Sequence, residues 1–381
     1  MGRLTRQLRS QLASLGLRSL SYGGYHARRF RCAINAKSRI GALLVDRMAD
    51  KERRRRQTRA HGGSASLSKI GLFLAVGLAG LTISSAASAE EGGMGHYLPG
   101  GLATIIDLPP VQPGWVVQPI YLHYEGEASR SRAFPVAGLV TGGLEANIDA
   151  LVMGALYTFE PKVLGAHYSV GAYLPYQWIE VSADLSTPRR TRSRTDRVSG
   201  FGDMTLIPAM MAWTSGPWQY SALLPIYAPT GRSEVGELAN LGLNYCTFDP
   251  SAGVTYNDDE TGFTFSVLSG ITINTENEAT QYRSGSVLHV EASAQKLFAL
   301  GNGFFGVGAN GFLYEQITDD TGAGALLGPF RGHAAGVGPV LSYIHPVGAT
   351  TLVLEARWLP ELSAKQRLKG DYLWLKGALD F

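Results

Sequence analysis

The sequence after Ala89 lacks any apolar run long enough for a membrane-spanning helix. Such a helix needs about 20 consecutive, mostly apolar residues, and no run of about 18 occurs between Glu90 and Phe381. A helical membrane protein is therefore excluded, and only a closed β-barrel could cross a membrane with these residues.

Cysteine is scarce: the 381 residues include only Cys32 and Cys246. Cys32 lies in a segment that we expect to be removed. A chain beginning at Glu90 would therefore hold Cys246 alone and could form no intramolecular disulfide. Its stability must come from other interactions.

Motifs for catalysis and metal binding are missing as well. The chain has no Gly-x-Ser-x-Gly, His-Glu-x-x-His, Cys-x-x-Cys or Gly-x-x-x-x-Gly-Lys pattern. The nearest approach to a catalytic group is Ser284 or Ser286 with His289. On a strand, Ser286 and His289 point to opposite faces and cannot form a hydrogen-bonded pair without a bulge. We expect no catalytic residue, no metal site and no cofactor.

Positive charge is rare in the larger part of the chain. Before Glu90 lie 17 of the 34 Lys and Arg residues and 3 of the 31 acidic ones, which leaves 17 basic and 28 acidic residues and a formal charge of −11. Nucleic acid is therefore not an expected partner. Residues 1–65 are basic and have little apolar periodicity, which predicts a disordered extension or a mis-assigned translation start.

The segment 66–89 has the layout of a secretory signal. Lys69 precedes an uncharged run over residues 70–83, and Ala87-Ser88-Ala89 precedes the acidic Glu90. Fourteen helical residues span about 21 Å, less than the roughly 30 Å hydrocarbon core. We expect a cleaved signal peptide, with a permanent anchor helix as the alternative, and export of residues 90–381 through the inner membrane.

Alternation with a period of two dominates residues 90–381 and is typical of β-strands. At the C-terminus, Leu373, Leu375 and Leu379 share a face with Phe381, whereas Lys376 belongs to the opposite face. Comparable runs predict twelve strands, and even numbers are usual in single-chain bacterial barrels. The ranges are 115–124, 146–158, 166–180, 203–214, 217–228, 243–256, 262–274, 286–298, 303–317, 334–345, 350–359 and 370–381.

These runs predict an all-β fold, an antiparallel transmembrane β-barrel of about 12 strands. A soluble periplasmic β-sandwich or barrel would alternate too. The membrane barrel is favoured for two reasons. Nearly every run has an apolar face and, opposite it, a polar face that would contact water. The last residue is Phe381, an aromatic residue on the lipid-like face of the terminal strand. Such a C-terminal strand resembles the signal by which the barrel-assembly machinery recognises outer-membrane barrels, and we expect that machinery as a partner.

The remaining segments are assigned to loops and edges. Residues 188–199 hold five arginines and predict a long outward loop, and the prolines in residues 90–113 predict an extended lead into the first strand. Aromatic residues near the strand ends would form interfacial girdles. They are Trp115, Tyr124, Trp178, Trp218 and Trp358.

Polar residues on the face opposite the lipid-like one would line the barrel lumen. A charge facing lipid costs about 2–4 kcal/mol at the bilayer midplane, so charges on the strands must point inward. These side chains could handle a solute, or they could only join the inside of the barrel through paired charges and hydrogen bonds. The candidate lumen-facing residues are His289, Glu291, Asn310, Tyr314, Gln316, Glu355 and Arg357.

The order of several motifs resembles one known family. Gly200-Phe201-Gly202-Asp203-Met204 is similar to its Gly-x-Gly-Asp segment. The family is that of exported outer-membrane proteins named after the meta-pathway of phenol degradation, a porin-like transporter family. Further matching positions are Pro208, Trp213, Asn274, Asn277, Thr280, Tyr282, Ser284, Gly285, His289, Gln316, Asp319, Asp320, Gly322, Gly328, Gly338, Pro339, Arg357, Trp358, Glu361, Arg367, Gly370 and Phe381.

The resemblance implies a barrel in the outer membrane of a Gram-negative bacterium, in contact with outer-membrane lipid. It also implies passive uptake of a small hydrophobic or aromatic solute, linked to degradation of that compound, and no enzymatic activity. The alternative is a structural or surface-interaction barrel without an open pore. A barrel of twelve strands lies between small barrels filled by side chains and large water-filled ones.

Overall fold

A computed structural model describes residues 94–187, 190–328, 331–348 and 350–381. The expected N-terminal extension (1–65) and signal segment (66–89) lie outside the described residues. Within the described part, no helix is both long and apolar enough to cross a membrane. Cys246 is buried, and Cys32 lies outside the described residues.

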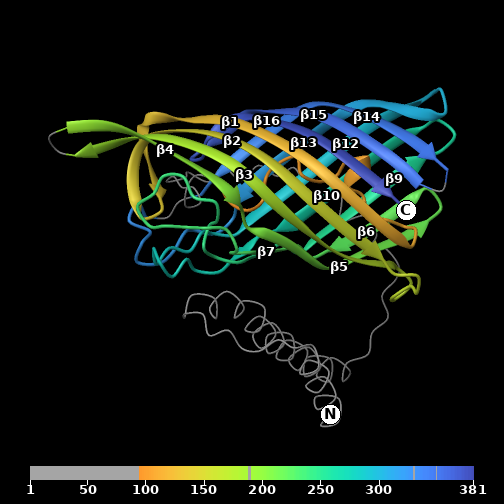
Figure 1. Cartoon of the computed structure of the whole chain (residues 1–381), viewed down its shortest axis with the longest axis horizontal. Helices are drawn as coiled ribbons and strands as arrows, with labels where there is room; N and C mark the ends of the chain where they lie inside the picture. Colours follow the sequence, from red (N-terminus) through yellow and green to blue (C-terminus); the bar gives the residue numbers. More distant parts are fainter. Residues whose placement is uncertain (1–93, 188–189, 329–330, 349) are drawn as a thin grey trace, which may run out of the picture. The chain divides into compact units, whose positions relative to one another are not determined.

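The described residues form a closed antiparallel β-barrel (Figure 1). The sheet closes because β1 pairs with β2 along one edge and with β16 along the other. Besides one short 3-10 helix, η2 (Ile105–Asp107), the elements are β1 (Gly114–Val136), β2 (Leu139–Thr158), β3 (His167–Thr187), β4 (Arg190–Phe201), β5 (Met204–Ser215), β6 (Trp218–Leu223), β7 (Ile226–Ala228), β8 (Thr247–Phe248), β9 (Ser251–Asp258), β10 (Phe263–Ile271), β11 (Ile273–Asn274), β12 (Val287–Leu300), β13 (Gly303–Gln316), β14 (His333–Val347), β15 (Thr350–Lys365) and β16 (Lys369–Asp380).

These segments make twelve strands around the barrel, which confirms the predicted number. Four strands are interrupted once, so that β4 continues into β5, β6 into β7, β8 into β9, and β10 into β11. The ring then runs β1, β2, β3, β4–β5, β6–β7, β8–β9, β10–β11, β12, β13, β14, β15 and β16, and returns to β1. Each predicted range overlaps one of these strands.

The four interruptions lie on neighbouring strands, and three of them have local causes. Pro225 and Pro250 lack the backbone N–H that a strand donates to its neighbour, and β7 and β9 begin directly after them. Gly202 adjoins the interruption between β4 and β5, where its N–H bonds to the Pro175 carbonyl at 3.0 Å. Asp203 and Asp249 lie at two of these interruptions, and both contact residues inside the barrel.

Side chains alternate between an exposed apolar belt and a buried inner face, as predicted. On β16, Leu373 and Leu375 are exposed while Trp374 and Lys376 are buried. Such a belt is what contact with lipid requires. Trp115 and Trp218 are exposed near strand ends, as expected for girdles, whereas Trp178 and Trp358 are exposed in the middle of β3 and β15. Tyr124 was assigned wrongly: it is fully buried, with its ring centroid 4.5 Å from that of Tyr372.

The two ends of the barrel differ. The C-terminus lies at one end with short turns, and the long loops 229–246, 275–286 and 317–332 gather at the other (Figure 1). In outer-membrane barrels short turns face the periplasm and long loops face outward. The chain follows this plan.

The predicted loop at 188–199 was wrong. β3 and β4 remain paired from Tyr176↔Phe201 to Thr187↔Arg190 and project beyond the neighbouring strands (Figure 1). Strands β1 and β2 also extend further than predicted. The apolar outer face ends before these extensions, where Glu145 on β2 is exposed. A strand beyond the lipid needs no apolar outer face, which is why the pattern did not indicate it.

The expected extended lead into β1 was also wrong. Residues 94–113, called the N-terminal segment from here on, bond to Gln118 on β1, Gln219 on β6 and Ser266 on β10. These strands lie at separate positions around the ring, so only a segment inside the barrel reaches all three. The N-terminal segment therefore occupies the lumen before the chain enters the barrel wall at Gly114.

Candidate functional site

All seven residues that the sequence assigned to the lumen are at most 4% exposed. Their strand neighbours Val307, Leu313, Leu354 and Trp358 are exposed apolar residues. The N-terminal segment brings several of the seven together. The alternation of the strands gave no indication that this segment is their partner.

Glu291 on β12 accepts three hydrogen bonds from the N-terminal segment. Its Oε1 accepts from the Tyr97 hydroxyl at 2.7 Å and from the Gly100 N–H at 3.1 Å, and its Oε2 accepts from the Leu102 N–H at 3.1 Å. A buried carboxylate without partners would be costly. The N-terminal segment thus satisfies the acid with neutral donors.

Arg357 on β15 holds the next part of the N-terminal segment. Its Nη2 lies 2.7 Å from the Asp107 carboxylate and donates to the Thr104 hydroxyl at 2.7 Å, and its Nη1 donates to the Gly100 carbonyl. Glu355, two residues earlier, lies 2.5 Å from the same Nη2. Two predicted residues, Glu355 and Arg357, therefore meet in one buried ionic cluster.

Lys376 completes this cluster from β16. Its Nζ lies 2.5 Å from Asp107 Oδ1 and donates to the Gly101 carbonyl at 2.8 Å. Burial by itself would raise the pKa of the Asp107 carboxyl, but Lys376 and Arg357 more than offset this, and the pKa lies below its ordinary value. Asp107 is therefore the ionised anchor of the segment.

His289 contacts the N-terminal segment through an aromatic ring. Its imidazole stacks on Tyr97 with ring centroids 3.9 Å apart, and its Nε2 lies 2.8 Å from Asp249 Oδ1. Tyr314 on β13 lies further along, with its ring centroid 6.3 Å from that of Tyr97 and 4.4 Å from the Arg367 guanidinium carbon. Tyr97 thus links His289, Glu291 and Tyr314.

Asn310 and Gln316 do not join this group. Asn310 donates to the Ala292 carbonyl of the neighbouring strand at 3.1 Å. Gln316 donates to Asp320 Oδ1 at 2.7 Å, and the same oxygen accepts from the Gly285 N–H at 2.7 Å. Asp320 also accepts from the Tyr282 hydroxyl. Part of the family motif therefore connects the loops 275–286 and 317–332 and fixes their shape.

The start of the N-terminal segment is held at the strand interruptions. His96 Nε2 lies 3.0 Å from Asp203 Oδ2, and His96 Nδ1 lies 2.7 Å from the Thr247 hydroxyl. Asp203 also accepts from the N–H groups of Gly231 and Leu243, both in the loop 229–246. One carboxylate therefore connects the barrel wall, the segment and the loop.

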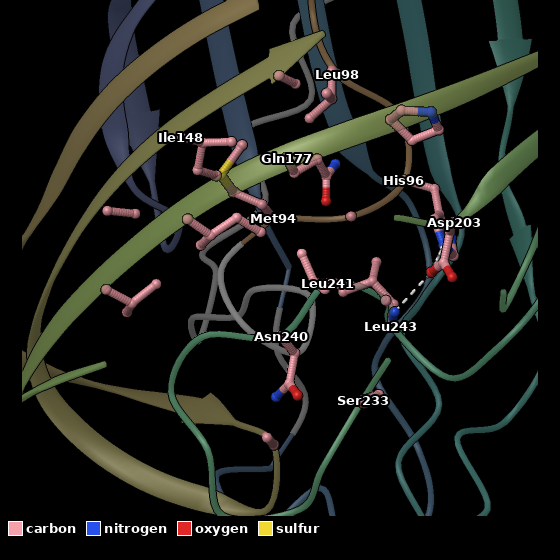
Figure 2. A pocket seen from close by; sticks show the side chains of 18 of the residues that line it. Met94, His96, Leu98, Ile148, Gln177, Asp203, Ser233, Asn240, Leu241 and Leu243 are labelled. Atoms are coloured by element: carbon pink, nitrogen blue, oxygen red, sulfur yellow. Dashed lines mark hydrogen bonds and ion pairs between the residues drawn. The ribbon is translucent and has the colours of Figure 1, made fainter. Parts of the chain in front are cut away.

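An apolar cavity of about 280 Å³ lies beside the N-terminal segment. Figure 2 shows Met94, His96 and Leu98 of the N-terminal segment around it, with Ile148 from β2 and Gln177 from β3, and the loop residues Leu241 and Leu243 below. The inner face of β2 is apolar along the cavity and contributes Leu144, Ala146, Ile148, Ala150 and Val152.

Sequence reasoning missed the N-terminal half of this site. Tyr97, Thr104 and Asp107 precede the first strand, where alternation gives no information. Lys376 carried a usable signal, because it belongs to the inward face of β16 and a charge there needs a partner. Within the described residues, no group of three or more His, Cys, Asp or Glu side chains is arranged to hold a metal ion.

Comparison with known proteins agrees with this architecture. An outer membrane channel from Pseudomonas putida F1 aligns with 75% of this chain and 100% of its own, at 14% identity and a TM-score of 0.53. The beta domain of the Bordetella autotransporter BrkA aligns with 71% of this chain and 100% of its own, at 8% identity and a TM-score of 0.44. The first similarity shows that this chain shares the barrel fold of a channel.

The comparison with curated proteins found no match. The sequence profile of a family described as "Putative MetA-pathway of phenol degradation" matches residues 130–377. The match covers more than half of the chain and includes most of the motif positions. The chain belongs to this phenol-degradation family of β-barrel proteins.

Proposed function

We propose that this protein is an outer-membrane channel for passive uptake of a small hydrophobic or aromatic solute. The observation that carries the proposal is the apolar cavity inside the barrel, formed by the inward residues of β1, β2 and β3. Binding sites for small molecules are concave and mostly apolar, with a few polar groups. Here the polar groups at the cavity include His96, Gln177 and Asp203.

The exposed apolar belt, the short turns at one end and the long loops at the other support a location in the outer membrane. The family's link to phenol degradation supports an aromatic or similarly apolar solute. The N-terminal segment must shift, at least in part, before a solute can pass the level of Glu291 and Arg357.

Two alanines on β2 allow a matched test. Ala146 lines the cavity, whereas Ala155 belongs to the outward face of the same strand. We expect Ala146→Trp to fill part of the cavity and lower uptake of labelled toluene by cells carrying the protein by about tenfold or more, because the indole ring occupies the space that the solute needs. Ala155→Trp should leave uptake unchanged at equal amounts of folded barrel.

Folded protein would be quantified by its altered gel mobility without boiling. Equal toluene uptake by cells with and without the protein, or equal loss in both variants, would refute the proposal. That result would favour the second candidate, a surface-interaction barrel without an open pore, which is supported by the N-terminal segment lying across the lumen.

We also propose that the barrel-assembly machinery recognises β16. Phe381 is exposed on the outer surface, and its backbone pairs with Trp115 at the closure of the barrel through bonds of 2.8 and 2.9 Å. Phe381→Ser should slow assembly in cells while leaving refolding of the purified chain in detergent unchanged. An equal effect in both settings would contradict a role in recognition.

A further inference from the structure

Two buried cations on the barrel wall hold a single carboxylate that does not belong to the wall. Arg357 and Lys376 come from the neighbouring strands β15 and β16, and each binds one oxygen of Asp107, at 2.7 and 2.5 Å. The side chains of Arg357 and Lys376 are 0% and 3% exposed. This is the geometry of a two-point carboxylate site in a water-excluded place.

The two strands β15 and β16 do not neutralise these cations by themselves. Glu355 offers one negative charge beside Arg357, so β15 and β16 would present two cations and one carboxylate without Asp107. Glu291 on β12 adds a negative charge to the surroundings of Arg357, but its oxygens accept hydrogen bonds from Tyr97 and backbone amides and form no ion pair with either cation. In addition, Arg357 Nε is buried and has no hydrogen-bond partner among the described residues.

The site adjoins the apolar cavity. The Trp374 ring lines the cavity, and its centroid lies 5.0 Å from Lys376 Nζ. Tyr173 also lines the cavity and donates to Gln118 Oε1 at 2.5 Å, while Gln118 holds the N-terminal segment through the Ile106 carbonyl. A molecule with an apolar body in the cavity would therefore have its polar end close to Lys376.

We propose that Arg357 and Lys376 form a lumenal binding site for the carboxylate of a small organic acid with an apolar or aromatic body. Asp107 occupies this site as a tethered substitute. The inference rests on the proposed function in that the acid must enter the lumen, and it adds a specific solute class. An incoming acid replaces Asp107 on both cations and releases this part of the N-terminal segment.

Competition with the tethered group sets the concentration scale. Even a group on a short flexible linker acts at an effective concentration in the millimolar range, and Asp107 is held more firmly by the other contacts of the N-terminal segment. A free acid must exceed that range to displace Asp107 in the unmodified protein. A variant without the Asp107 carboxylate should bind the same acid at much lower concentration.

The test uses the purified full chain with Asp107→Ala in detergent and benzoate as the probe. We expect benzoate to bind this variant at least about tenfold more tightly than the unmodified protein, since the tethered competitor is gone. Asp107→Ala should also lower the temperature at which heating changes the gel mobility of the barrel. Benzoate should raise that temperature back toward the value of the unmodified protein. Benzamide, which has the same ring and no charge, and chloride at equal concentration should do neither.

Two control variants separate the site from general charge effects. Asp107→Ala with Lys376→Met should lose benzoate binding because one of the two cations is gone. Asp319→Ala removes a carboxylate from an exposed pair with Arg331 and should create no benzoate site. If Asp107→Ala does not fold, Asp107→Ser also removes the carboxylate but keeps a small polar side chain. We expect the same benzoate binding and the same effect of benzoate on heat stability for this variant.

Equal benzoate affinity in Asp107→Ala and the unmodified protein, or equal rescue by benzamide or chloride, would overturn the inference. These binding measurements need no transport. Failure of the proposed function would instead appear as absent toluene uptake with the benzoate site intact, so the two failures are distinguishable.

Discussion

The Asp107 carboxylate lies 2.7 Å from the guanidinium of Arg357, and both side chains are buried. Asp107 precedes the first strand, whereas Arg357 lies on β15 near the end of the chain. The contact joins the N-terminal segment to a strand formed by the last part of the chain.

Removing Arg357 should be strongly destabilising. Arg357→Met leaves Asp107 and Glu355 without their shared cation, and loss of one member of a buried ion pair costs about 3–5 kcal/mol. Urea unfolding in lipid vesicles would measure the loss. Arg331→Met is the matched control, because Arg331 pairs with Asp319 at the surface and exposed pairs contribute about 0–1 kcal/mol. A similar decrease in the free energy of unfolding in both variants would show that the buried ion pairs of Arg357 contribute no more stability than the exposed pair of Arg331.

The contribution of Asp107 should depend on pH in a defined window. Its pKa lies below the ordinary value of 3.8, so the ionised form stabilises the folded state above that value. This stability is lost as the pH falls through the lower, folded-state pKa. We expect the stability difference between the unmodified protein and Asp107→Asn to be constant from about pH 8 to 5 and to shrink below about pH 4. Urea titrations of both proteins across this range would check it, and a difference already shrinking near pH 6 would argue against an ionised anchor.

Gly100 should be essential for seating the N-terminal segment. Its φ of 80° is unfavourable for other residues, and an added Cβ would collide with the Leu359 side chain. We expect Gly100→Val to displace the segment and raise single-channel conductance in planar bilayers severalfold. Gly165→Val is the control, because Gly165 has a similar φ of 78° and open space around its Cα. An equal conductance change in both variants would point to backbone strain rather than displacement.

The outer belt predicts where a charge is tolerated. Leu375 lies in the middle of β16 and is 44% exposed, so Leu375→Arg should destabilise the barrel in lipid by about 2–4 kcal/mol. Glu145→Arg places the same charge on the outer face of β2, in the part that extends beyond the predicted strand, and should have little effect. Refolding into vesicles, followed by gel mobility without boiling, would compare them. Equal tolerance at both positions would mean that Leu375 does not face lipid.

The sequence by itself determined the barrel and the side on which each strand residue lies. Alternation on β12, β15 and β16 is a local property, because successive side chains of a strand point to opposite faces. It therefore predicted an inward orientation for Glu291 and Arg357, which are buried, and it predicted twelve strands. Alternation ceased to be informative where the outer face becomes polar, so the extensions of β1 to β4 were missed.

Only the tertiary structure decided what fills the lumen. Tyr97 and Asp107 lie in a segment without periodicity, and their partners Glu291, Arg357 and Lys376 follow nearly 200 residues or more later. No local pattern connects residues so far apart. The closed sheet brings three strands of the wall to one place, and the charges that must avoid lipid become the anchor for the N-terminal segment.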